Sequence, residues 1–379
     1  MLTLSVYAAT VELNANHPDT YTVRKGDTLW SISARFLKQP WLWPEVWQAN
    51  PQIKNPHLIY PGDEISLAYV NGRPRLMVNA SHEEGFGPHV RATPLEDAIK
   101  PIPLERIQDF LKKPRWVGEE DIKTLPHVLA MEDDHIRGTP GQLIYVRNLN
   151  APVGTTFAVV RPLGRYYEIA YKDGGGTEVF RQTMRDRDDR PSQLWHRGPD
   201  LYTLKGDVHF LGYEMEQFAT VQVTHEGNPA STLALSADYE IRQGDYLLPM
   251  TDAPFDFQYV PHAPAQLPPN MHVIALSDSI ANAGRFQVIA LSRGARDGVE
   301  NGQTYAIFHE GSKVRDYNDY PGESATTFFH HDESKVQLPE EYIGHVMVFR
   351  TFDAISYGLI MDGIRPVHIG DRLYEPDHR

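Results

Sequence analysis

The first regular pattern along the chain is a short strand-like run followed by apolar residues at helical spacing. Tyr21–Val23 has the pattern of a short β-strand, and Leu29, Ile32 and Phe36 then recur at the i, i+3 and i+7 spacing of one helical face. Thr28 stands just before this run and is a favoured N-cap residue. The pattern therefore predicts a strand, a turn and a first helix.

A second helix and a closing strand are predicted further along. Pro44 suits the first turn of a helix, Glu45 suits the positive end of its dipole, and Val46 and Ala49 share a face that we expect to be buried. After a Pro-Gly turn, Glu64–Leu67 has the pattern of a strand. The predicted order of this segment is βααβ.

The motifs of this segment resemble those of a known family. They read Y-T-V-x-x-G-D-T-L-W-x-I, then W-x-x-N-P, then I-Y-P-G-D-x-I. This series is similar to that of LysM modules, small βααβ domains that bind glycans containing N-acetylglucosamine, such as peptidoglycan. The resemblance implies a peptidoglycan-binding domain over residues 20–68.

The resemblance also implies where a glycan would lie, namely between the strand–helix turn and the loop that precedes the last strand. Carried over residue by residue, the glycan-binding residues are Gly26, Asp27, Thr28 and Leu29 on one wall and Ile53, Leu58 and Ile59 on the other. Glycine allows a close approach of the backbone, and amides near a helix start can donate to an N-acetyl carbonyl. For Thr28, helix capping and ligand contact remain equal alternatives.

Three tryptophans lie within the second half of this segment. Trp41 and Trp43 fall in the inter-helix turn, away from the implied groove, so we expect them to pack in the core or as a lid. Trp47 is open to two interpretations, packing or an external contact. The tryptophans are therefore expected to support the groove rather than to line it.

Residues 69–139 are rich in proline and predict an extended connector. Within it, Leu104, Ile107 and Leu111 share one face of a short helix predicted between Pro103 and Pro114. Outside that helix no regular periodicity is evident.

Short alternating runs beyond residue 139 predict a mainly-β region. It contains three pairs of similar segments in the same order: GTTFAVV with GQTYAIF, LGYEM with IGHVM, and IRQGDYL with VHIGDRL. These pairs predict two copies of one β-rich unit, at residues 140–253 and 271–379, with a proline-rich linker at 254–270. Each copy has a long polar insert, which is either a contact surface or a solvated loop. The predicted fold class is α+β and multidomain: a βααβ module followed by two related β-rich repeats.

Composition narrows the location and the partners. The net charge of −14 argues against broad binding to nucleic acid or to an anionic membrane. The chain has no cysteine, and no apolar run is long enough to span a membrane. Residues 1–19 begin with an apolar stretch ending Val-Tyr-Ala, which resembles the end of a truncated signal peptide, although an ordinary frayed terminus is the alternative.

Catalytic and metal-binding motifs are scarce. The sequence lacks Gly-x-Ser-x-Gly, Ser-x-x-Lys, His-x-His and His-Glu-x-x-His, and it has no phosphate-binding glycine loop. Adjacent loop histidines at His330 and His331 are more often solvated than bound to metal. We therefore expect no enzyme activity, no cofactor and no metal site, with a wall-targeted enzyme or an activator of a peptidoglycan hydrolase as the alternative.

The order of modules along nearly the whole chain resembles a second family, the type IV pilus secretin-associated proteins. Their LysM part binds peptidoglycan, and their C-terminal region is similar to the C-terminal domain of the flagellar protein FlgT. The segments that carry this likeness are AIKPIPLERIQDFLKKPRWV and the final GDRLYEP. The resemblance implies a non-catalytic adaptor in the Gram-negative periplasm, anchored on peptidoglycan and associated with the outer-membrane secretin, with several copies forming a ring around it.

Overall fold

A computed structural model describes most of the 379 residues. The described residues are 11–47, 59–79, 103–112, 114–170, 177–183, 207–250, 259–277, 282–316, 318 and 335–378. Most of the expected signal-peptide remnant, at residues 1–10, and the first polar insert, at residues 185–200, lie outside them.

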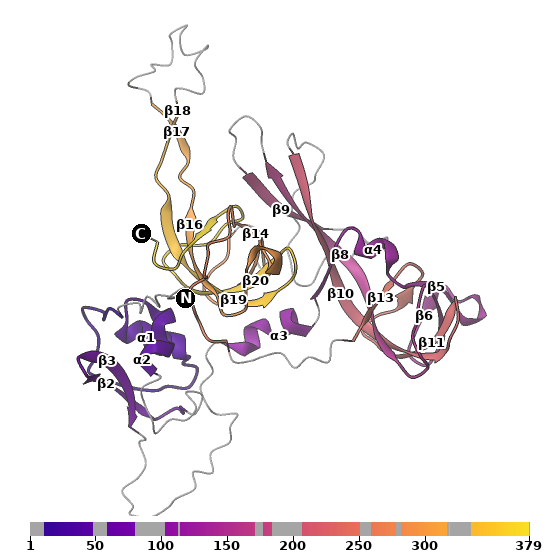
Figure 1. Ribbon diagram of the computed structural model, residues 1–379, viewed down its shortest axis with the longest axis horizontal. Coiled ribbons are helices and arrows are strands. Elements are labelled where there is room, and N and C mark those ends of the chain that lie inside the picture. The colour runs from indigo at the N-terminus through magenta and orange to yellow at the C-terminus, as the bar shows by residue number, and fades with distance from the viewer. Residues whose placement is uncertain are drawn as a thin grey trace, which may run out of the picture.

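The N-terminal module contains short helices and one antiparallel sheet of three strands, in the order β1-β2-β3 (Figure 1). Its elements are β1 (Thr20–Thr22), α1 (Leu29–Phe36), the 3₁₀ turn η1 (Pro40–Leu42), α2 (Trp43–Trp47), β2 (Glu64–Val70) and β3 (Arg73–Asn79). The predicted strand, two helices and closing strand are present. The third strand was not predicted, and it takes up the first residues of the expected connector.

The core of this module follows the predicted helical face. Leu29, Ile32 and Phe36 are all buried on α1. Trp43 and Trp47 of α2 are 2% and 4% exposed and pack in the same cluster. The packing role expected for Trp43 is therefore confirmed, and of the two interpretations of Trp47 the structure shows packing.

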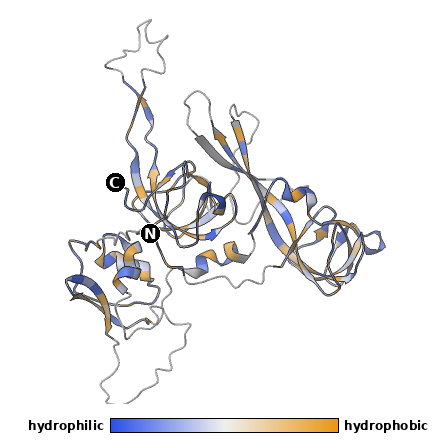
Figure 2. Cartoon of the chain, viewed as in Figure 1, coloured by the Kyte–Doolittle hydropathy of each residue, from blue (hydrophilic) through white to orange (hydrophobic). Residues whose placement is uncertain are grey.

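The expected connector contains more regular structure than its proline content predicted. Helix α3 (Leu104–Lys112) confirms the predicted helix, with Ile107 and Leu111 buried. Hydrophobic and hydrophilic residues both occur along this helix (Figure 2). Beyond it, β4 (Pro114–Val117) and β5 (His127–Met131) belong to the next sheet. The prediction of an extended connector over residues 69–139 is thus wrong at both of its ends. β3 pairs with the adjacent β2, whereas β4 and β5 pair with β10 and β7, and these pairings outweigh the local effect of proline.

The next region is a sheet whose strands form a closed ring. Pairings run β5–β7–β11–β10–β8–β13 and return from β13 to β5, with β4 and β9 added outside the ring. The remaining bounds are α4 (Asp121–Thr124), η3 (Glu132–Asp134), β6 (Arg137–Gly138), β7 (Leu143–Arg147), β8 (Thr156–Ala170), β9 (Thr177–Thr183), β10 (Asp207–His225), β11 (Ala230–Ala237), β12 (Ile241–Arg242) and β13 (Tyr246–Pro249). We call this the first closed sheet.

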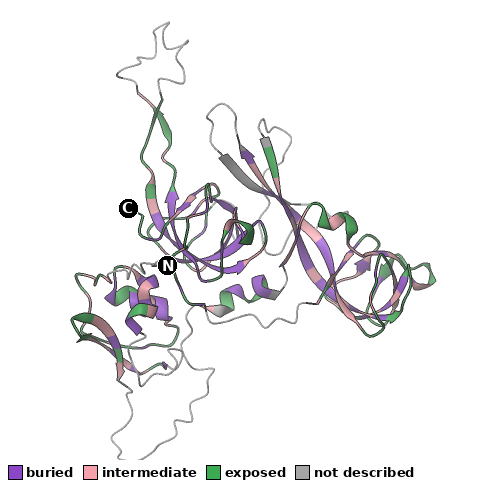
Figure 3. Cartoon of the chain, viewed as in Figure 1, coloured by how far each residue is buried: buried purple, intermediate pink, exposed green. Residues whose placement is uncertain are grey.

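The C-terminal region also contains a sheet whose strands form a closed ring. Pairings run β14–β15–β20–β19–β16–β21, and a bridge between His272 and Arg372 joins β21 back to the start of β14. The bounds are β14 (Val273–Leu276), β15 (Val288–Leu291), η5 (Ala295–Asp297), β16 (Thr304–His309), β17 (Lys313–Arg315), β18 (Lys335–Gln337), β19 (Glu341–Thr351), β20 (Ser356–Gly363) and β21 (Arg372–Tyr374). We call this the second closed sheet. Its β17–β18 hairpin projects as an exposed arm (Figure 3).

The two closed sheets have bulges at matching places. In β10, Phe218 is skipped in the pairing with β8, and in β19, Ile343 is skipped in the pairing with β16. This register corrects one sequence correspondence. Phe218–Gln222, rather than Leu211–Met215, holds the place of Ile343–Met347.

A hydrophobic cluster joins the three bodies of the molecule. It includes Trp30 and Trp41 of the N-terminal module, Ile107 and Phe110 of α3, Tyr166 and Leu211 of the first closed sheet, and Phe349, Tyr357 and Met361 of the second. The residues expected to form a free linker also contribute, because Tyr259 is buried in this cluster. The module and both sheets therefore pack as one assembly.

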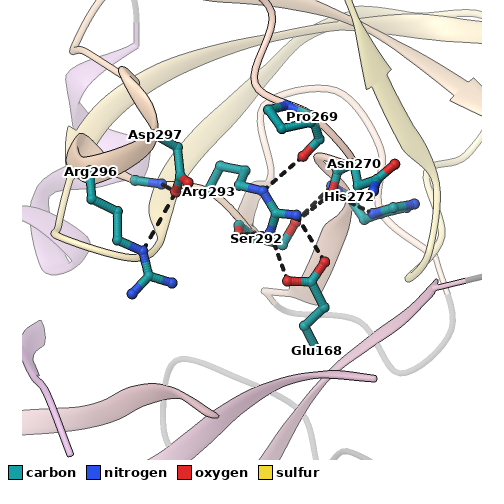
Figure 4. Close-up of polar contacts among 9 residues, drawn as sticks. Glu168, Pro269, Asn270, His272, Ser292, Arg293, Arg296 and Asp297 are labelled. Atoms are coloured by element: carbon teal, nitrogen blue, oxygen red, sulfur yellow. Dashed lines mark hydrogen bonds and ion pairs between the residues drawn. The ribbon is translucent and has the colours of Figure 1, made fainter. Parts of the chain in front are cut away.

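Buried polar contacts accompany this cluster. Arg350 donates through Nη2 to the Pro114 carbonyl at 2.6 Å and through Nη1 to the carbonyls of Phe110 and Leu111, which end helix α3. Arg293 of the second closed sheet forms a bidentate pair with Glu168 of β8, at 2.8 and 3.0 Å (Figure 4). Such paired geometry fixes orientation as well as distance.

Within the described part of the chain, none of the helices has the length and apolarity needed to span a bilayer.

Candidate functional site

The turn between β1 and α1 forms the first wall of the candidate glycan site. Gly26 has φ of +92°, a conformation that glycine adopts without strain, and no atom lies within 4 Å of where a Cβ would stand. The Oδ2 atom of Asp27 accepts hydrogen bonds from the Tyr21 hydroxyl and the Arg24 amide, both at 2.8 Å. Burial, with the Asp27 hydrogen bond, raises the pKa of Tyr21, so this hydroxyl stays protonated and keeps donating. The carboxylate of Asp27 thereby holds the turn in shape.

Helix α1 begins directly after this turn with a capping box. Thr28 Oγ1 accepts from the Ser31 amide at 3.1 Å, and Ser31 Oγ accepts from the Thr28 amide at 3.0 Å. The first helical bond runs from the Ile32 amide to the Thr28 carbonyl. The amides of Leu29 and Trp30 precede that bond, so they have no acceptor within the helix, and both residues are only 1% exposed.

A second turn lies beside the first. The Val23 amide donates to the Asp63 carbonyl and the Gly62 amide donates to the Val23 carbonyl, each at 2.8 Å. The buried carboxylate of Asp63 accepts from the Tyr60 amide at 2.9 Å and closes the Tyr-Pro-Gly-Asp turn. The structure therefore brings together the strand–helix turn and the end of the loop before β2, as the resemblance implied.

The predicted site residues divide into three groups. Gly26 is exposed and Asp27 is half-buried, so both are accessible. Thr28, Leu29 and Ile59 are 5%, 1% and 0% exposed as whole residues, and Leu29 and Ile59 belong to the hydrophobic core. Ile53 and Leu58 lie outside the described residues. Leu29 and Ile59 are therefore core residues of the domain, and neither presents an accessible wall to a sugar.

A cavity of about 400 Å³ lies where the module meets the second closed sheet. Its lining residues are Lys38, Gln39, Trp41, Phe308, Glu340, Tyr342, His345, Pro376, Asp377 and His378. The ring centroid of Trp41 is 4.4 Å from that of His345, and Gln39 donates to Asp377 at 2.7 Å. Sequence reasoning placed Trp41 in a core or a lid but missed this partner, which lies 304 positions further along the chain.

Comparisons with known proteins concern the N-terminal module. A protein of Bacillus subtilis (strain 168) described as uncharacterized protein YqbP is 35% identical over 60 residues, which is 13% of this chain and 27% of that protein. The chain thus spans about a quarter of the length of the relative it matches. The LysM domain family matches residues 21–68, which hold the turn, the capped helix and the Tyr-Pro-Gly-Asp loop. Residues 21–68 are therefore a LysM domain, a carbohydrate-binding module of a protein whose remaining described part is mainly β-sheet.

Proposed function

We propose that this protein is a non-catalytic adaptor of the cell envelope, which binds the N-acetylglucosamine-containing glycan of peptidoglycan through its LysM domain. The observation that carries the proposal is the open strand–helix turn at Gly26, which comes shortly before the capped start of α1. In this proposal the glycan lies against this turn, with Asp27 and Thr28 shaping the wall, and Ile53 and Leu58 remain the glycan-binding residues proposed for the opposite wall. The buried side chains of Leu29 and Ile59 support the groove from below.

The two closed sheets form the body that contacts a partner. We treat them as copies of one unit, duplicated within the chain, because their strand order and bulge positions agree. The partner that the sequence resemblance implies is the outer-membrane secretin of type IV pili. The protein would then lie in the periplasm of a Gram-negative cell, between peptidoglycan and the outer-membrane secretin, and several copies in a ring would strengthen weak glycan binding through effective concentration.

Rigid packing of the LysM domain against the second closed sheet suits an adaptor. Trp30 and Trp41 anchor the module to that sheet, whereas Arg24, Lys25 and Gly26 stay exposed. A glycan chain held at the turn is therefore kept at a fixed position relative to the sheets.

Glycan binding is tested with two matched glycine variants of the full chain. Gly26→Phe and Gly72→Phe each place a ring at a positive-φ position with nothing within 4 Å of the Cβ, but Gly72 lies in the β2–β3 turn. Co-sedimentation with purified sacculi is expected to fall for the first variant and to persist for the second. Equal binding by both would contradict the proposed groove.

The secretin link and the absence of catalysis need separate experiments. Deleting the gene and imaging secretin rings in the envelope should reveal altered material around the ring, and unchanged rings would contradict the secretin partnership. Incubating the protein with sacculi should release no muropeptides. Steady release would instead favour the alternative of a wall-targeted enzyme, and release only when a hydrolase is added would favour an activator.

A further inference from the structure

A buried carboxylate in the second closed sheet is paired with a histidine, whereas its counterpart in the first is paired with an arginine. Asp371 is 2% exposed, and its Oδ2 accepts from the His368 amide at 2.7 Å in a turn where Gly370 has φ of +94°. Its Oδ1 lies 2.7 Å from Nδ1 of His309, the last residue of β16. A buried carboxylate needs a cation or further hydrogen bonds to offset the loss of hydration.

The first closed sheet has the same turn with a different partner. Asp245 is 3% exposed, its Oδ2 accepts from the Arg242 amide at 2.7 Å, and Gly244 has φ of +89°. Here Arg161 of β8 forms a bidentate pair with the carboxylate, at 2.6 and 2.7 Å. A permanently charged guanidinium thus holds the place that the imidazole of His309 holds in the second closed sheet.

A second imidazole completes the group. His368 holds the place of Arg242, its ring centroid lies 5.3 Å from that of His309, and its Nδ1 lies 3.9 Å from Asp371 Oδ2. Among the described residues this Nδ1 has no hydrogen-bond partner although the atom is buried. One donor atom from each of the three residues falls within a span of 4.8 Å.

We propose that His309, His368 and Asp371 bind a divalent transition-metal ion, with Zn²⁺ as the ion whose ligand preferences fit. Ligands of a tetrahedral Zn²⁺ lie at about 2.0–2.2 Å from the ion, hence about 3.3–3.5 Å from one another. The donor atoms of the three residues, all within 4.8 Å of one another, are already close to that spacing. Both histidines are partly exposed, at 49% and 41%, so the fourth position is open to water.

The site lies at the root of the projecting arm. His309 ends β16, from which the chain runs into β17, whereas His368 and Asp371 belong to the turn before β21 (Figure 1). A bound ion would join these two segments and fix the direction in which the β17–β18 hairpin leaves the sheet. In the first closed sheet the Arg161–Asp245 pair already makes the equivalent connection.

The test uses the full-length protein, stripped of metal by a chelator and titrated with Zn²⁺ alone in a calorimeter. One ion should bind per chain with micromolar or tighter affinity, and His309→Gln and His368→Gln should each weaken it at least tenfold. His225→Gln, at an exposed histidine at the end of β10, should change nothing. Circular dichroism checks that each variant is folded.

X-ray absorption on the Zn²⁺-loaded wild-type protein gives a second measurement that needs no variant. It should show two imidazole ligands and oxygen ligands at about 2.0–2.2 Å. Absence of Zn²⁺ uptake, affinity unchanged in both histidine variants, or a spectrum with fewer than two imidazoles would overturn the proposal.

Discussion

The indole nitrogen of Trp30 lies 3.3 Å from Oδ2 of Asp362, so helix α1 of the LysM domain is hydrogen-bonded to strand β20 of the second closed sheet. The other oxygen of Asp362 lies 2.9 Å from Nδ1 of His345, whose ring packs on Trp41. The carboxylate of Asp362 thus contacts Trp30 directly and Trp41 through the ring of His345.

Asp362→Ala should therefore loosen the attachment of the LysM domain while leaving that domain folded. A hydrogen bond to a charged group contributes about 1.5–3 kcal/mol to stability. Loss of these bonds should therefore expose Trp30 and Trp41 part of the time. Hydrogen exchange should accelerate at α1 and η1, and tryptophan emission should shift to longer wavelength. Asp353→Ala is the control, because Asp353 is exposed and its contact to Arg296 spans 3.9 Å. Identical exchange in both variants would rule out the proposed role of Asp362.

The second prediction concerns the contact between the two closed sheets. Arg293 and Glu168 have side chains only 11% and 13% exposed, so removing one partner leaves the other charge poorly hydrated (Figure 4). Arg293→Ala should lower the free energy of unfolding by about 3 kcal/mol, toward the lower end of values for broken buried pairs. Urea denaturation measures this change.

Double-variant analysis separates the ion pair from the lost packing. Glu168→Gln combined with Arg293→Ala should destabilise less than the sum of the two single changes, because the charge left unpaired is gone. Additive effects would show that the two residues contribute independently and that the pair does not connect the sheets.

The third prediction is a loss of stability in mild acid that depends on His272. This residue is 3% exposed, and burial lowers the pKa of its imidazole below the ordinary value of 6.5. The unfolded chain then binds a proton at a higher pH than the folded chain does. The contribution of His272 to stability is complete above pH 6.5 and declines as the pH falls below it toward the folded-state pKa. Unfolding in urea at neutral and mildly acidic pH should show this decline, and His272→Gln should reduce it; an unchanged decline would assign it to other groups.

Local pattern predicted the parts of the fold that depend on neighbouring residues. The spacing of Leu29, Ile32 and Phe36 located α1, and Thr28 was recognised as a favoured N-cap residue. Each signal depends on residues that lie within about two helical turns of one another. Strand β3 was missed because Arg73 and Pro74 are unfavourable in an interior strand. Among the described strands, however, β3 pairs only with β2 and tolerates these residues at the edge of the sheet.

Long-range relationships were harder to predict. Leu211–Met215 was matched with Ile343–Met347 in error because β10 is 19 residues long and bulged. Similar residue patterns therefore recur at different places along this one strand. Likewise the metal-binding candidates His309 and Asp371 lie 62 positions apart and form no spacing motif. The repeated Gly-Asp turn could have drawn attention to Asp245 and Asp371, but only the strand pairing shows what faces them.

The fourth prediction distinguishes the two kinds of tryptophan in the LysM domain. Trp43 packs in the core of the domain, so Trp43→Ala should destabilise it by about 3–5 kcal/mol, the usual cost of removing a buried aromatic ring. A domain of this size has little stability to lose, and binding to sacculi should disappear with its fold. Trp41 packs instead against His345 of the second closed sheet. Trp41→Ala should therefore release the domain from the sheet but preserve co-sedimentation with sacculi. If Trp41→Ala abolished glycan binding in a folded domain, the cavity beside Trp41 would belong to the glycan site, and the separation of anchor from groove would be wrong.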